Sequence, residues 1–330
     1  MQADWKQRWA REVRNKNAYF ERMQNPGINE QMGIVKTARG YGFDYHELVR
    51  YLPPGFYEPA FDTEARKFCL NRTAFGNSTE AQTQYISQNY FEVEAYVKPF
   101  AYLRKSVDKF LASKAFYNEK KLDYKRSFLL CGDPGTGKSR FIAQMAERAI
   151  KEQEAVVIRV HSRNSFEELL KGVDTLASFL SDRMKIIIIE ELYELIKDKS
   201  LAEVLNLLDS PKLKENVLFM ITTNHPDRIP YNLIDRPSRI DEIIPVYKED
   251  FQSEFIIKWF EHVMEQDFPE KELNSGFLKD VSGKLTLAYL QEVFLKSYME
   301  DLSLSESYRK IKIRQEMISR QFARSGEIGF

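Results

Sequence analysis

One stretch of the sequence decides its predicted fold, namely Gly132-Asp133-Pro134-Gly135-Thr136-Gly137-Lys138-Ser139. It fits the pattern G-x-x-x-x-G-K-[ST] of a phosphate-binding loop, or P-loop. The apolar run 128–131 before it is typical of a buried strand, and the residues after it favour a helix. Because strand, loop and helix follow in the order that the pattern requires, a chance glycine-rich turn is a poor alternative.

The residue types of this loop suit a nucleoside triphosphate. Glycines allow backbone N–H groups to surround phosphates, and the N-terminus of the next helix adds partial positive charge. We expect Lys138 to reach the β- and γ-phosphates and Ser139 to ligate Mg²⁺. The sequence therefore predicts ATP and Mg²⁺ as cofactors, with all eight loop residues binding nucleotide.

Strand-like and helix-like segments alternate around the loop. Apolar runs lie at 127–131, 155–160, 185–189, 217–222 and 242–246, and helical patterns lie at 138–151, 165–180 and 201–208. This alternation predicts an α/β fold, a parallel sheet covered by helices on both faces. Beyond about residue 250 the pattern is helical throughout, which predicts a small lid-like bundle.

We expect four parts along the chain: an N-terminal extension or specificity domain at 1–95, a large α/β ATPase domain at 96–248, a helical lid at 249–302 and a charged helical tail at 303–330. The first part is rich in aromatic residues but holds twelve basic and twelve acidic residues. This balance favours a specificity domain or a packed extension of the ATPase core over a nucleic-acid binder.

Two adjacent carboxylates end the apolar run 186–189. In a parallel sheet the carboxyl ends of strands face the ligand crevice. We therefore expect Glu190 to take part in Mg²⁺ binding and Glu191 to polarise the water that attacks ATP. The alternative is that acidic residues simply end a strand and begin a helix. Aspartate is the usual residue at the first position, so Glu190 is a departure.

Asn224 ends the next strand, at the same edge of the predicted sheet. We expect it to orient water or to bind the γ-phosphate. A turn asparagine is the alternative, because the turn-forming residues 225–227 follow.

Two arginines three residues apart, Arg236 and Arg239, precede the last predicted strand. A guanidinium is permanently charged and stabilises the transition state of phosphoryl transfer. If a neighbouring subunit supplies it, hydrolysis depends on assembly. The alternative is surface salt bridging with Asp235 and Asp241.

Composition limits the remaining possibilities. Lysine plus arginine and aspartate plus glutamate both number 49, so bulk attraction to nucleic acid or anionic membrane has no support. Two cysteines make no disulfide framework. The apolar run 186–189 is far too short to span a bilayer, and the first residues lack an apolar signal core. These features predict a cytoplasmic protein that does not enter membranes.

Together the segments resemble the AAA family of ATPases over about 96–302. The stretches that carry the resemblance are GDPGTGKS, IIIIEEL, LAEVLNLLDS, VLFMITTNHPDRI and LIDRPSRID. They are similar to the branch that contains the mitochondrial inner-membrane translocase of the Rieske iron–sulfur protein and its soluble bacterial relatives. The resemblance implies strand order 5-1-4-3-2 and a C-terminal helical lid. It also implies a ring of six or seven subunits that hydrolyses ATP at its interfaces and remodels protein.

The sequence departs from threading relatives in two places. The region after the second strand lacks their aromatic-glycine pair, and Phe166 is expected on the apolar face of the next helix. No arginine opens the predicted lid helix, where Lys284 is a weak phosphate contact and Thr286 a predicted N-cap.

Two functions fit these motifs. The first is an ATP-driven ring that remodels or translocates a protein partner. The second is a nucleotide-controlled assembly switch, such as a DNA-associated loader, transposition regulator or defence component, which recruits an effector. The motifs do not separate them, because additions to a shared fold set its function.

Overall fold

The computed structural model describes residues 34–37, 40–43, 52, 54–62, 67–73, 91–264 and 273–325. Their contacts form two compact units. The first contains the described residues before 89, Val107–Leu130 and Ser139–Ile243. The second contains the described residues of Tyr90–Ser106, Cys131–Lys138 and Ile244–Phe330. Most of the P-loop thus belongs to the second unit, with the C-terminal helices, and the predicted acidic and arginine residues belong to the first.

Within the described residues one nine-stranded sheet runs in the order β1-β2-β4-β3-β6-β7-β8-β5-β9. The strands are β1 (Ile34–Thr37), β2 (Gly40–Phe43), β3 (Gly55–Asp62), β4 (Lys67–Thr73), β5 (Lys125–Cys131), β6 (Val156–Val160), β7 (Lys185–Ile189), β8 (Val217–Thr223) and β9 (Glu242–Pro245). From β9 to β6 the strands around the P-loop stand in the expected order 5-1-4-3-2. The complete order differs from the prediction, because four strands from before residue 74 extend the sheet. Of these, β3 runs parallel to β6, whereas β3, β4, β2 and β1 pair antiparallel with one another.

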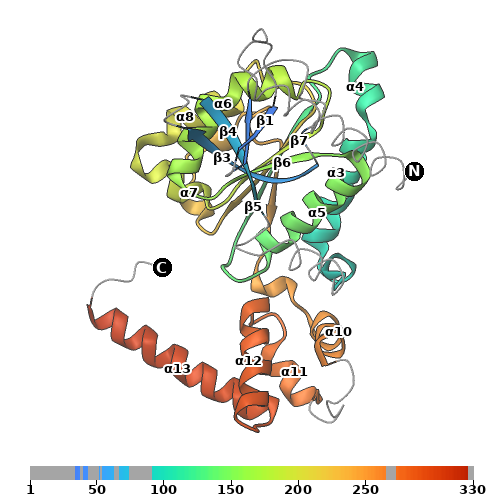
Figure 1. Ribbon diagram of the computed structural model, residues 1–330. Helices are drawn as coiled ribbons and strands as arrows, with labels where there is room; N and C mark the ends of the chain where they lie inside the picture. Colours follow the sequence, from blue (N-terminus) through green and yellow to red (C-terminus); the bar gives the residue numbers. More distant parts are fainter. Residues whose placement is uncertain are drawn as a thin grey trace. The chain divides into compact units, whose positions relative to one another are not determined.

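Helices cover both faces of this sheet, as the alternation predicted. Figure 1 shows α6 and α8 on one side and α5 on the other. The helical elements from residue 93 to 234 are η2 (Val93–Ala95), α3 (Lys98–Ala112), α4 (Lys114–Lys120), α5 (Lys138–Gln153), α6 (Arg163–Phe179), α7 (Leu192–Leu195), the π-helix η3 (Ile196–Ser200), α8 (Leu201–Leu208), η4 (Pro226–Arg228) and α9 (Tyr231–Ile234).

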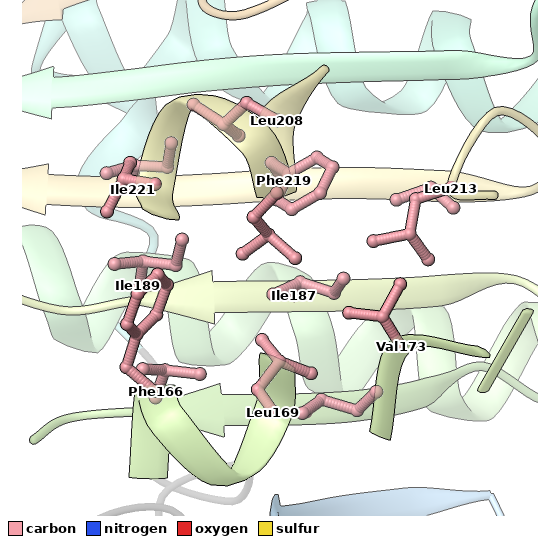
Figure 2. Close-up of a cluster of buried hydrophobic side chains, with 14 of the residues drawn as sticks. Phe166, Leu169, Val173, Ile187, Ile189, Leu208, Leu213, Phe219 and Ile221 are labelled. Atoms are coloured by element: carbon pink, nitrogen blue, oxygen red, sulfur yellow. The ribbon is translucent and has the colours of Figure 1, made fainter. Parts of the chain in front are cut away.

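Helix α6 shows why its sequence packs on the sheet. Ser162 caps the helix, since its hydroxyl accepts the N–H of Ser165 while the Ser165 hydroxyl accepts that of Ser162. One stripe of the helix is buried at spacings of three and four. Figure 2 shows this stripe against the inner faces of β7, β8 and α8, with the labelled side chains Phe166, Leu169, Val173, Ile187, Ile189, Leu208, Leu213, Phe219 and Ile221. Phe166 thus lies on the apolar face of its helix, as predicted.

The added strands pack on the same core. Tyr57, Phe68 and Leu70 belong to the buried cluster that contains the α6 stripe. A Cβ on Gly172 of α6 would lie 2.2 Å from Cε2 of Phe68, so the helix needs a glycine where the ring of β4 crosses it. The described part of residues 1–95 therefore extends the ATPase sheet and its core; the rest of that predicted part lies outside the described residues.

The second unit is helical after residue 247, as the pattern predicted. Its elements there are η5 (Lys248–Asp250), α10 (Ser253–Met264), α11 (Ser275–Val281), α12 (Leu287–Met299) and α13 (Leu304–Ser325). The core is aromatic: Phe260 contacts Phe277 and Phe294 edge to face, and Phe91 contacts Phe255 in the same way. Among the helices that the structure describes, none combines the length and apolar character needed to cross a membrane.

Candidate active site

The P-loop joins β5 to α5, and its lysine contacts the loop itself. Lys138 is buried, and its Nζ donates to the carbonyl oxygens of Gly132 at 2.9 Å and Asp133 at 2.7 Å, and to the hydroxyl of Thr136 at 3.3 Å. The three loop glycines have positive φ, the conformation that curls a P-loop. A curled glycine backbone with an ammonium group among its oxygens fits the phosphates of a nucleotide.

Neighbouring segments of the same unit fix the base of the loop. The Val246 N–H donates to the carbonyl of Cys131 at 2.8 Å, and the Lys248 N–H donates to Oδ2 of Asp133 at 2.9 Å. Gly132 comes so close to this segment that a Cβ would lie 2.2 Å from the carbonyl oxygen of Val246. Burial raises the pKa of the Cys131 thiol, although the Lys138 ammonium opposes this shift.

The start of helix α12 also contacts the loop. The Ala288 N–H donates to the carbonyl of Gly135 at 3.0 Å, so a P-loop carbonyl satisfies the first turn of this helix. Thr286 is the N-cap residue, as predicted, but its side chain makes no capping hydrogen bond, and its hydroxyl is buried without a partner. Lys284 Nζ donates to the carbonyl of Lys279 at 2.9 Å.

Glu190 lies at the end of β7, whose five residues are buried. Its Oε2 accepts from Nη2 of Arg159 at 2.8 Å, and its Oε1 is buried with no hydrogen-bond partner among the described residues. A buried carboxylate oxygen that lacks a donor suits a cation, so this residue fits Mg²⁺. The described residues contain no group of three or more His, Cys, Asp or Glu able to hold a metal. A P-loop magnesium site does not need one, because hydroxyl, phosphate and water oxygens supply the other ligands.

Glu191 and Asn224 lie together, as expected from their positions at the ends of β7 and β8. The Asn224 Nδ2 donates to Oε1 of Glu191 at 2.6 Å, and the Asn224 N–H donates to Oε2 at 3.3 Å. The Glu191 N–H donates to the hydroxyl of Thr222 at 3.1 Å. Glu191 has φ of 50°, a left-handed conformation that is rare for a side chain of this kind. The backbone of β8 therefore holds this carboxylate in a defined position.

The two predicted arginines share one carboxylate that the sequence analysis did not identify. Arg239 donates to Oδ2 of Asp209 from Nε at 3.0 Å and Nη2 at 2.6 Å, and from Nη1 to the carbonyl of Asn232 at 2.7 Å. Arg236 contacts the same Oδ2 at 3.2 Å but keeps 61% of its side chain exposed, against 13% for Arg239. The Arg239 guanidinium holds the pKa of Asp209 below its ordinary value. Arg239 is thus fixed within its own chain, and Arg236 is largely exposed.

The salt bridges of the arginine pair go to Asp209 rather than to the expected Asp235 and Asp241. Asp241 instead accepts the backbone N–H of Ser127 at 2.7 Å and pairs with Arg126 at 3.7 Å. Asp209 ends the segment LAEVLNLLDS, and an acidic residue after an apolar helix was the only signal that could have identified it.

Comparison with known proteins agrees with this geometry. Residues 128–247 match the family described as "ATPase family associated with various cellular activities (AAA)". They begin in β5, contain the P-loop and both carboxylates, and end just after β9. The chain therefore contains an AAA ATPase domain, and the resemblance drawn from its motifs is confirmed at that level.

Within that family the chain is similar to a mitochondrial protein. It is 26% identical over 153 residues to the human mitochondrial chaperone BCS1, a match that covers 42% of this chain and 35% of that protein. The bovine protein of the same name is 26% identical over 155 residues, with the same coverage. The match thus spans about a third of the length of these relatives.

Proposed function

We propose that this chain hydrolyses ATP and that a neighbouring copy completes each active site. The observation that carries the proposal is the Glu191–Asn224 pair, which holds a carboxylate by two hydrogen bonds at the ends of adjacent strands. A general base needs such a fixed position to accept a proton from water. The second hydrogen-bond donor of the Asn224 amide is available to orient the same water.

Each predicted residue has a role in this mechanism. The P-loop backbone and Lys138 bind the phosphates, and Ser139 and Glu190 would hold Mg²⁺. When bound, Mg²⁺ supplies positive charge that neutralises oxygens of the β- and γ-phosphates. Glu191 takes the proton of the attacking water.

Arg236 is the residue that we assign to the neighbour's nucleotide. Its guanidinium is mostly exposed, whereas Arg239 is tied to Asp209 and to a backbone carbonyl. The pair thus divides into an arginine that can reach a second chain and one that positions it. A closed ring of copies, hexameric or heptameric, would give every site its arginine.

The work done by hydrolysis is proposed from kinship. BCS1 is named a chaperone, which supports remodelling or translocation of a protein partner by this chain. Phe166 is buried in the core, so it offers no aromatic contact to a threaded polypeptide. That burial favours the second candidate to the same degree, a switch whose ATP state recruits an effector. Capture of a partner by the ATP-bound Glu191→Gln variant would be common to both, and release or refolding of the partner on hydrolysis by the wild type would identify the first.

The experiment that tests the shared site mixes two inactive variants. Arg236→Ala and Glu191→Gln should each be inactive alone, whereas mixed assemblies contain some interfaces with Glu191 from one chain and Arg236 from the other. We expect partial recovery of turnover on mixing and a steep rise of wild-type activity per chain with concentration. Absence of recovery in assemblies shown to be mixed, with concentration-independent wild-type activity, would place Arg236 outside the catalytic machinery.

A further inference from the structure

Arg159 of β6 lies between two carboxylates from its neighbouring strands. Its Nη2 is 2.8 Å from Oε2 of Glu190, and its Nη1 is 3.8 Å from Oε1 of Glu58 on β3. Arg159 and Glu190 each expose 13% of their side chains, and Glu58 exposes 29%. One side-chain cation is thus shared unequally between two acids, and His161 Nδ1 approaches the outer one at 3.5 Å.

The strand pairing explains why these three side chains meet. Strand β3 pairs parallel with β6, with Tyr57 opposite Ile158. The next residues, Glu58 and Arg159, therefore project together from the other face. Arg159 stands opposite residue 188 of β7, and Glu190, two positions further on, shares its face. The arrangement follows from sheet register and does not depend on a flexible loop.

We propose that Glu58 is a positioning residue for the metal site, because it takes over Arg159 when Glu190 binds a divalent cation. The inference rests on the metal role proposed for Glu190. As the structure stands, Arg159 neutralises the carboxylate that a cation would need. A guanidinium and a cation on one carboxylate repel each other, and a largely buried guanidinium is costly to leave without a carboxylate partner. Glu58 provides that partner within reach of the same arginine.

This exchange gives the added strands a part in catalysis. Strand β3 precedes the residues that match the AAA family, yet it supplies the acid that releases Glu190. Two carboxylates and one guanidinium leave one negative charge for an incoming cation. Without the Glu58 carboxylate the group is neutral, and the cation must displace Arg159 with no acceptor for it.

The test measures metal-dependent nucleotide binding in the full chain. A fluorescent ATP analogue is titrated at a series of Mg²⁺ concentrations and in EDTA, and Mn²⁺ binding to the nucleotide-bound protein is followed by electron paramagnetic resonance. Glu58→Gln keeps side-chain size and should raise the Mg²⁺ and Mn²⁺ concentrations for half-saturation about three- to tenfold, the scale of one lost charge in a partly exposed pair. Binding in EDTA should be unchanged. Glu167→Gln, which removes an acid from the exposed pair with Arg163, is the matched control and should change neither value.

A second background tests the route through Arg159. In Arg159→Gln chains the additional Glu58→Gln change should have no further effect on metal affinity, since the guanidinium to be accepted is gone. Equal metal affinity of Glu58→Gln and wild type overturns the inference, and so does an equal loss of binding with and without metal, which would indicate a merely structural role. If Arg159→Gln does not fold, the comparison of Glu58→Gln with Glu167→Gln decides the matter. Wild-type nucleotide binding that ignores Mg²⁺ would instead refute the proposed function.

Discussion

Replacing the two arginines of α9 and the following turn one at a time should separate two roles that the sequence cannot distinguish. Arg239→Ala removes two hydrogen bonds to Asp209 and one to the carbonyl of Asn232, from a side chain that is only 13% exposed. A hydrogen bond to a charged group is worth about 1.5–3 kcal/mol when buried. Because Asp209 is 29% exposed and its bonds share one oxygen, we expect a loss of about 2–3 kcal/mol in the free energy of unfolding in total.

Arg236→Ala should behave in the opposite way. Its single contact at 3.2 Å belongs to a largely exposed side chain, so the loss of stability should be about 0.5 kcal/mol or less. Its turnover should nevertheless fall about 10³-fold at unchanged ATP affinity, the scale of a lost arginine finger.

Urea denaturation and steady-state ATP hydrolysis on the same preparations measure both quantities, and Arg163→Ala is a control of similar exposure. Equal destabilisation by the two α9-region variants, or full turnover of Arg236→Ala, would show that both arginines are structural.

Three further outcomes follow from the described contacts. Lys138→Ala should abolish ATP binding in a folded protein, measured by titration calorimetry, and unchanged affinity would mean that the phosphate site lies elsewhere. Glu191→Gln should bind ATP and retain it in a filter-binding assay, whereas Glu190→Gln should raise the Mg²⁺ requirement; if Glu190→Gln retains ATP instead, their roles are reversed. Burial lowers the pKa of Lys185 to about 8 from 10.5. The unfolded chain therefore binds more protons than the folded one between these values, and the unfolding free energy of the wild type relative to Lys185→Met should rise by about 1–3 kcal/mol from pH 7.5 to 10.5. A pH-independent difference in chemical denaturation would contradict that shift.

The central sheet was predictable because local pattern and tertiary environment agree there. Strands β5 to β9 are short apolar runs, and each lies next to the partner that a P-loop sheet implies. Strand β3 was not predictable in the same way. Its sequence GFYEPAFD contains Pro59, which lacks a backbone donor and usually argues against a strand. Its parallel partner β6 begins about a hundred residues later, and no spacing within the chain indicates such a pairing.

The site divides along the same line. Glu190, Glu191 and Asn224 follow apolar runs, and the ends of neighbouring parallel strands meet at one edge, so their proximity could be expected from the sequence. Asp209 and Arg159 are linked to the site by contacts between different elements, which only the packed structure specifies. The sequence gave the expected arginines but the wrong acids for them.

Glu191 shows why sequence preference and site geometry part company. A left-handed backbone costs a residue with a Cβ about 1 kcal/mol, and glycine or asparagine would relieve it. Here a glutamate occupies the conformation at the N-cap of α7, without capping that helix through its side chain. Its carboxylate is instead turned to Asn224 and its N–H to the hydroxyl of Thr222. A position that needed only to end β7 and start α7 would favour a smaller residue with a capping side chain. The retained carboxylate at this cost is the signature expected of a residue kept for chemistry rather than for stability.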